Sequence, residues 1–211
     1  MTSVPSERAL LAFAASVFVF HHLPTAAGNA GDWIDLATPF VVVGAAAALL
    51  VALRPPATAL VVALLAALLY VDGHGIHLAA NSIAGESPTG EAEETAHFWD
   101  ERFGHIEWHL GWIGLIGSFC LADRARPIPL ETRVQAAIAL LLGFTLFTST
   151  VEGGTWWLEL GAAVLFATWA TLDRRPLLVT TAAAFGVGAV LIGAWAVWQG
   201  GVPEFSEAGL I

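Results

Sequence analysis

Residues 57–80 have the sequence ATALVVALLAALLYVDGHGIHLAA. No charged residue occurs before Asp72, and as an α-helix the stretch would be about 36 Å long, more than the roughly 30 Å of hydrocarbon in a bilayer. The stretch therefore predicts a membrane-spanning helix. Asp72, His74 and His77 lie toward its carboxyl-terminal end, so we expect this helix to carry ionisable groups close to one membrane face.

The composition of the whole chain also indicates a membrane protein. Of its 211 residues, 57% are hydrophobic and 12% are charged, whereas soluble domains have roughly 25% charged residues. We expect an integral protein of the plasma (inner) membrane whose main partner is the lipid bilayer. The formal charge of -10 argues against nucleic acid as a partner, and the single cysteine, Cys120, excludes an intrachain disulfide.

Further apolar stretches predict an all-α fold, a polytopic bundle of seven transmembrane helices forming one domain over residues 1–211. The predicted spans are 9–28, 33–53, 57–80, 97–122, 131–151, 155–172 and 177–198. Proline and glycine occur at the breaks between them. The first span also has features of a cleavable signal peptide, but His21 and His22 interrupt its apolar run, and we interpret it as a retained helix.

The arginines predict the orientation of the bundle. If seven spans alternate, all arginines except Arg102 fall on one side, and arginine-rich loops are typical of the cytoplasmic face. The amino terminus is then cytoplasmic and the carboxyl terminus outside. The opposite loops are acidic, which favours cations as partners.

All seven histidines fall in the outer halves of the first, third and fourth predicted spans. Their positions are 21, 22, 74, 77, 97, 105 and 109. His97, Glu101, His105 and His109 recur every four residues and would form one stripe along a helix. Ionisable groups at membrane depth cost several kcal/mol unless they are paired, so such a cluster normally marks a site or an ion path.

Imidazoles that converge with carboxylates predict a transition-metal site, with zinc as the first expectation and iron or copper as alternatives. The predicted ligands are His74, His77, His105 and His109, joined by His21 or His22. Asp72, Asp100 and Glu107 are the predicted catalytic carboxylates or orienting partners of the imidazoles. An unmetallated hydrogen-bonded relay and a heme site remain open as interpretations of the same histidines. Ser82 follows the histidine pair without a recognisable nucleophile elbow, and Ser149 lies beside Thr148 and Thr150 in the fifth predicted span, so no catalytic triad is assigned.

The segment His105-Ile106-Glu107-Trp108-His109 resembles the HxxWH element of ceramidase-like members of the seven-helix CREST intramembrane hydrolases, which bind zinc through three histidines. The resemblance implies that His105 and His109 are zinc ligands of a membrane hydrolase. It covers five residues and the span count. The family has its motif in the last span rather than the fourth, and its early serine-to-histidine spacing is missing here.

The sequence therefore predicts a membrane metalloprotein with its site toward the outside, a metal-dependent hydrolase or oxidase acting on a lipid-like substrate. The alternatives are a metal or proton transport or relay protein and a heme-binding electron carrier. The inner halves of the spans hold few polar residues, which disfavours a complete transport path.

Overall fold

The computed structural model describes residues 4–86 and 89–210, and within them the regular structure is helical throughout. The elements are α1 (Val4–Ala26), η1 (Gly28–Ala30), α2 (Gly31–Leu53), α3 (Ala57–Gly85), α4 (Glu91–His97), η2 (Phe98–Gly104), α5 (His105–Ala125), α6 (Thr132–Glu152), α7 (Trp156–Leu172) and α8 (Pro176–Gln199). The predicted all-α class is confirmed. Five helices, α1, α2, α3, α6 and α8, are long and apolar enough to cross a membrane, and α7 is a shorter apolar helix.

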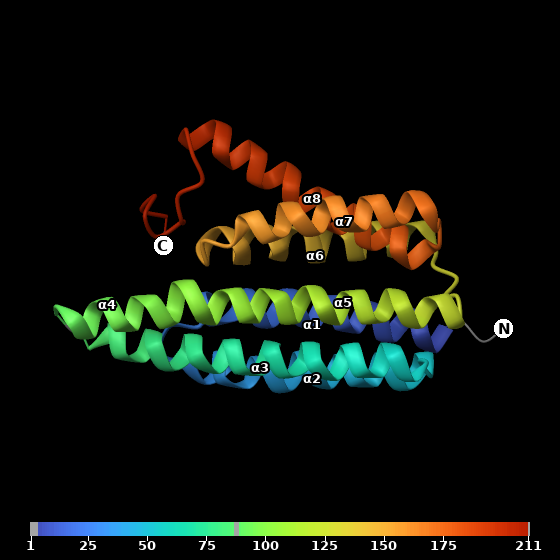
Figure 1. The fold of residues 1–211 in the computed structure, drawn as a ribbon, viewed down its shortest axis with the longest axis horizontal. Helices are drawn as coiled ribbons and strands as arrows, with labels where there is room; N and C mark the ends of the chain where they lie inside the picture. The colour runs from blue at the N-terminus through green and yellow to red at the C-terminus, as the bar shows by residue number, and fades with distance from the viewer. Residues whose placement is uncertain (1–3, 87–88, 211) are drawn as a thin grey trace.

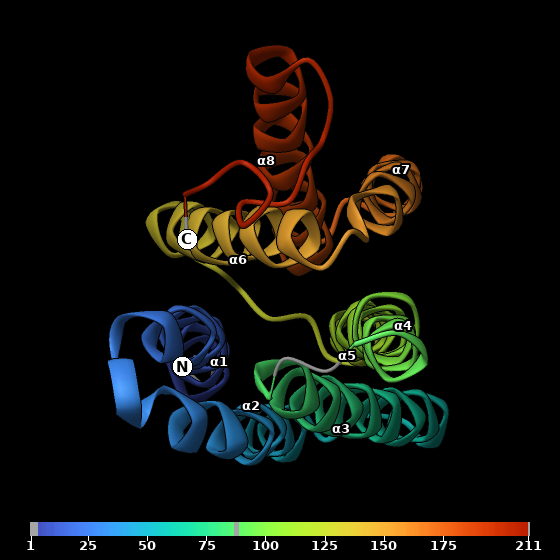
Figure 2. The ribbon, with the colours of Figure 1, turned by 90° about the vertical axis from the view of Figure 1, so that its left-hand side faces the viewer.

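The helices form two groups that pack side by side. Figure 1 shows α6, α7 and α8 on one side of the bundle and α1, α2, α3 and α5 on the other, and the end-on view in Figure 2 shows the same division. The principal packing pairs are α3 with α5, α1 with α2, and α6 with α8, while α1 and α6 join the two groups. The two ends of the chain lie at opposite ends of the bundle (Figure 1).

The bundle has an apolar interior and an apolar exterior. Phe13 and Phe119 meet edge to face at 5.0 Å inside, and Phe166 stacks on Phe185 at 4.8 Å. On the outside, Val51 and Val164 are 76% and 68% exposed, in company with many leucines and valines of α2, α3 and α7. A water-soluble protein rarely exposes a continuous apolar surface of this kind, whereas lipid solvates it well.

Glycines set the closest helix contact, between α3 and the segment η2–α5. A Cβ atom added to Gly73 would clash with the backbone nitrogen of Trp108 and would lie 2.6 Å from the Gly104 carbonyl oxygen. Gly111 meets the backbone of Tyr70 in the same way. Since only glycine permits this approach, these residues place the histidine-bearing part of α3 directly against η2.

Candidate metal centre

A π-helical segment breaks the regular spacing just before α5. In η2 the backbone N–H of His105 donates to the carbonyl oxygen of Asp100, a five-residue step in place of the four-residue step of an α-helix. Residues five apart therefore come to lie on one face, which aligns Asp100 with His105. Glu101 also stays near His105, as the expected stripe with a period of four requires, with Oε2 3.4 Å from His105 Nδ1. Segments of this kind are frequent at functional sites.

Three potential ligands meet where η2 packs against α3. One ligand atom each from His77, Asp100 and His105 lies within 4.8 Å of the others, the one such group of ligand atoms found in the described part of the chain. His77 Nδ1 lies 2.5 Å from Asp100 Oδ1, and His105 Nδ1 lies 3.8 Å from the same oxygen. Ligands of a tetrahedral zinc ion are separated by about 3.3 Å, given Zn–N and Zn–O bonds of about 2.0 Å. To hold an ion, His105 Nδ1 would have to move slightly closer to Asp100 Oδ1, and His77 Nδ1 would have to move slightly away from it.

The hydrogen bonds within this three-residue group leave atoms that a cation could bind. His77 donates its Nδ1 proton to Asp100 Oδ1, and a metal ion between the two atoms would take the place of that proton. His105 Nδ1 is buried and lacks a hydrogen-bond partner among the described residues, although Glu101 Oε2 lies 3.4 Å away. Buried polar atoms normally have hydrogen-bond partners. A metal ion bound to this nitrogen would take the place of the missing partner.

The group borders a polar cavity of about 390 Å³. Its lining includes His21 from α1, Asp35 from α2, His77 from α3, and Asp100, Glu101 and His105 from the η2–α5 segment, with Ser149 and Glu152 from α6. Helices far apart in the sequence thus turn histidines and carboxylates toward one space.

Two of the four principal predicted ligands lie elsewhere. His74 is fully buried against α2, where its Nε2 lies 3.2 Å from Asp35 Oδ1 and 3.0 Å from the Asp35 carbonyl oxygen. His109 lies one turn beyond His105 and contacts Ser149 Oγ at 2.7 Å and Thr155 Oγ1 at 2.5 Å. The structure therefore brings His77 and His105 together and gives His74 and His109 other partners.

The adjacent pair His21 and His22 points in two directions. His21 lines the polar cavity, whereas His22 approaches Thr148 Oγ1 at 3.0 Å and the Phe18 carbonyl oxygen at 2.7 Å. This agrees with the expectation that one residue of the pair at most faces the site. His97 lines a neighbouring pocket together with Glu101 and Glu204.

Of the three predicted catalytic carboxylates, only Asp100 is in the cavity lining. Asp72 is exposed, and Glu107 packs beside Gly73 on the other side of the α3–α5 contact. Sequence reasoning gave no site role to Asp35, Glu152 or Ser149. Asp35 and Glu152 lie at the outer ends of the predicted spans 33–53 and 131–151, and nothing in the sequence indicates which helix they face.

The carboxyl-terminal segment adds negative charge beside the cavity. Glu152 Oε2 accepts hydrogen bonds from the backbone nitrogens of Phe205 and Ser206, at 2.8 and 3.2 Å, and holds this segment in place. Partial burial, followed by the charges of Glu101 and nearby carboxylates, raises the pKa of Glu204 to about 7. The carboxylates that contribute to this shift after burial, Glu101, Glu207, Glu152 and Asp100, also place negative charge here that would attract cations.

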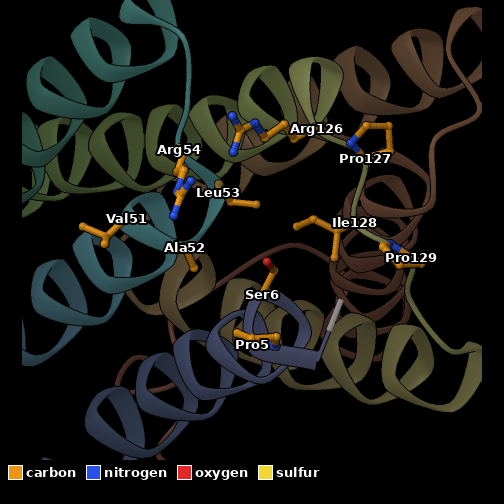
Figure 3. Close-up of a pocket in the computed structure, with 10 residues that line it drawn as sticks. All are labelled: Pro5, Ser6, Val51, Ala52, Leu53, Arg54, Arg126, Pro127, Ile128 and Pro129. Carbon is orange, nitrogen blue, oxygen red and sulfur yellow. The ribbon is translucent and has the colours of Figure 1, made fainter. Parts of the chain in front are cut away.

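A second, larger cavity lies at the opposite end of the bundle. It has a volume of about 810 Å³ and is lined by Pro5, Ser6, residues 51–54 and residues 126–129 (Figure 3). Its charged lining residues are Arg54 and Arg126, so it offers no metal ligands.

No family model, curated protein or solved structure matches this chain. The resemblance of residues 105–109 to the CREST hydrolases therefore stays a prediction, and the functional argument rests on the geometry of the chain itself.

Proposed function

We propose that this protein is a membrane metalloprotein in which His77, Asp100 and His105 bind one transition-metal ion. The observation that carries the proposal is the convergence of these three ligand atoms within 4.8 Å at the edge of a polar cavity. Three protein ligands leave a position free for water or substrate, the arrangement of catalytic rather than structural zinc sites.

Zinc is the proposed metal and hydrolysis the proposed reaction. Zinc lowers the pKa of a bound water toward 7 and so supplies hydroxide at neutral pH. Glu101 takes the role of general base in place of Glu107, because it lines the cavity and Oε2 has no hydrogen bond within the described ranges. A lipid-like substrate reaches the site from the outer leaflet. The nearby carboxylates favour a neutral or cationic headgroup over an anionic one.

A second candidate is an iron-dependent oxidase. Two histidines and one carboxylate with open positions are also the ligand set of non-heme iron oxygenases. A transport path receives less support, because the buried residues between the two ends are mainly apolar, with scattered polar exceptions such as Ser118, Thr145 and Glu159.

Elemental analysis tests the metal and separates the two candidates. Detergent-purified protein without affinity-tag histidines is compared with Asp100→Asn and with His97→Ala, a histidine outside the three-ligand group. About one equivalent of zinc or iron in the wild type and in His97→Ala, and its loss in Asp100→Asn, is the expected result. Equal metal content in all three proteins, or none after reconstitution with zinc and iron, contradicts the proposal.

The proposed orientation places the site outside and the amino terminus in the cytoplasm, with α5 and α7 also crossing the membrane. It is supported by Arg54 and Arg126 lining the cavity at the opposite end of the bundle (Figure 3). Because Cys120 is buried, single cysteines can report the topology. Ser206→Cys should react with a membrane-impermeant maleimide from outside, and Arg126→Cys only after lysis. The reverse pattern contradicts the orientation.

A further inference from the structure

Ser149, His109 and Thr155 form a hydrogen-bonded series beside the metal group. Ser149 Oγ lies 2.7 Å from His109 Nε2, and Thr155 Oγ1 lies 2.5 Å from His109 Nδ1. All three residues are at most 3% exposed. A hydroxyl within hydrogen-bond reach of an imidazole, which a third group orients through its other nitrogen, is the arrangement that activates a serine nucleophile.

The Ser149 hydroxyl differs from its neighbours on α6. Thr145 donates to the Leu141 carbonyl at 2.9 Å, and Thr150 donates to the Leu146 carbonyl at 2.7 Å, as hydroxyls within helices usually do. Ser149 instead bonds to His109 on α5. In the tautomer of His109 that carries its proton on Nδ1, Ser149 donates to Nε2 and Nδ1 donates to Thr155 Oγ1.

The surroundings hold the His109 ring in this position. Trp108 stacks on it with ring centres 5.5 Å apart and planes inclined by 10°. Beside the end of α6, Gly153 lies against both imidazoles: an added Cβ would lie 2.7 Å from His105 Cδ2 and 3.2 Å from His109 Cε1. The nucleophile is also reachable, since Ser149 lines the polar cavity of about 390 Å³.

From this geometry we propose that Ser149 is a nucleophile for acyl transfer, with His109 as its general base and Thr155 as a positioning residue. The substrate class is a carboxylic ester of a lipid with an uncharged or cationic headgroup. This activity goes beyond the proposed metal site and does not require an ion. The two share one cavity, and with Ser149 as the nucleophile the metal group would bind and orient the substrate instead of supplying hydroxide.

The reaction balances with the groups present and one water molecule. Ser149 Oγ forms a bond to the ester carbonyl carbon while its proton moves to His109 Nε2. The bond to the alcohol oxygen then breaks, and His109 returns the proton to the leaving alkoxide. Water attacks the acyl-serine with His109 again accepting the proton, the fatty acid leaves, and Ser149 regains its hydrogen.

The test is covalent labelling with an alkyl fluorophosphonate, which phosphonylates activated serines and releases fluoride. We expect the detergent-purified wild type to gain one adduct by intact mass, assigned to Ser149 by peptide mapping. Ser149→Ala should lose it, and Thr150→Ala, which removes the adjacent hydroxyl, should keep it. His109→Gln should slow labelling at least about 100-fold, the usual contribution of a general base.

The role of Thr155 is tested by measuring the labelling rate as a function of pH. If Thr155 only stabilised the fold, its substitution would not shift this pH profile. Thr155→Val removes the partner of Nδ1 and should slow labelling and shift its pH midpoint, whereas Thr155→Ser should restore both. Size-exclusion profiles confirm that the variants are folded. No adduct on the wild type, or an equal adduct on Ser149→Ala, overturns the proposal.

Metal content measured on the same samples keeps the two proposals apart. We expect Ser149→Ala to retain its metal and Asp100→Asn to retain its label. If the wild type is labelled at Ser149 but holds no metal, only the proposed metal site is wrong. If it holds metal but is not labelled, only the proposed serine nucleophile is wrong.

Discussion

The two ends of the bundle use their charged residues in opposite ways. At the arginine end, defined by Arg54, Arg126 and Arg175, polar groups fasten turns: Arg175 Nη1 donates to the carbonyl oxygens of Asp123 and Arg124 at 2.8 and 2.9 Å. At the histidine end, defined by the cavity around His77 and His105, polar side chains from separate helices face one another across a space. Charged side chains that hydrogen-bond to the backbone of a turn stabilise the fold. Charged side chains that lie close together around a cavity, with polar atoms that lack hydrogen-bond partners, indicate a functional site.

The largest loss of stability is expected from a substitution at Gly73, where α3 contacts the backbone of the η2–α5 segment at the histidine end. Gly73→Val should lower the free energy of unfolding by about 3 kcal/mol, the upper range for overpacking, because the nearest atoms belong to the Trp108 and Gly104 backbones and cannot rotate away. Thermal unfolding in detergent measures the change. Gly75→Val is the matched control, since a Cβ there meets no described atom within 4 Å. Equal melting temperatures for the two variants would contradict the packing argument.

Zinc binding should change the free energy of unfolding by slightly less than the Gly73 substitution does, and the change should depend only on residues of the histidine end. An ion that binds only the folded protein, at 100 times its dissociation constant, adds about 2.7 kcal/mol to the free energy of unfolding. We expect zinc to raise the melting temperature of the wild type and not that of Asp100→Asn. Asp123→Ala, which alters the arginine end, should respond as the wild type does. A zinc response in Asp100→Asn would show that the ion binds elsewhere.

The arginine end should respond to substitution in stability alone. Asp123 is fully buried, and its Oδ1 accepts the Ile128 backbone N–H at 2.6 Å. Asp123→Ala leaves that donor buried and unpaired, which costs about 1–2 kcal/mol. Asp173→Ala breaks only partly exposed ion pairs with Arg124 and Arg175 and should cost less than about 1 kcal/mol. Thermal unfolding ranks the two, and a fall in metal content in either would break the division between the ends.

The all-α class and the apolar spans could be predicted because hydropathy is a property of continuous segments. The histidine layer could be predicted too, since depth in the membrane follows from position along a helix. His77, Asp100 and His105 could be named as site residues from the sequence, but they could not be singled out as the ligand set, because that depends on how η2 packs against α3 and on the π-helical step between Asp100 and His105. The partners of His74 and His109 depend on how α2 and α6 pack, and periodicity within one helix carries no information about that packing.

The smallest expected effect is a pH dependence at the histidine end. The pKa of Glu204 is raised to about 7, chiefly by burial and then by Glu101 and other carboxylates, so the folded protein holds a proton there that the unfolded chain has released above about pH 4.5. The resulting stabilisation is present below pH 4.5 and is lost as the pH rises through 7. Between pH 5 and pH 8 the melting temperature of Glu204→Gln should fall less than that of the wild type, and Glu86→Gln, at the exposed end of α3, should behave as the wild type does. Parallel curves for the wild type and Glu204→Gln would mean that negative charge is not concentrated beside the cavity, and the attraction of cations toward the site would lose its support.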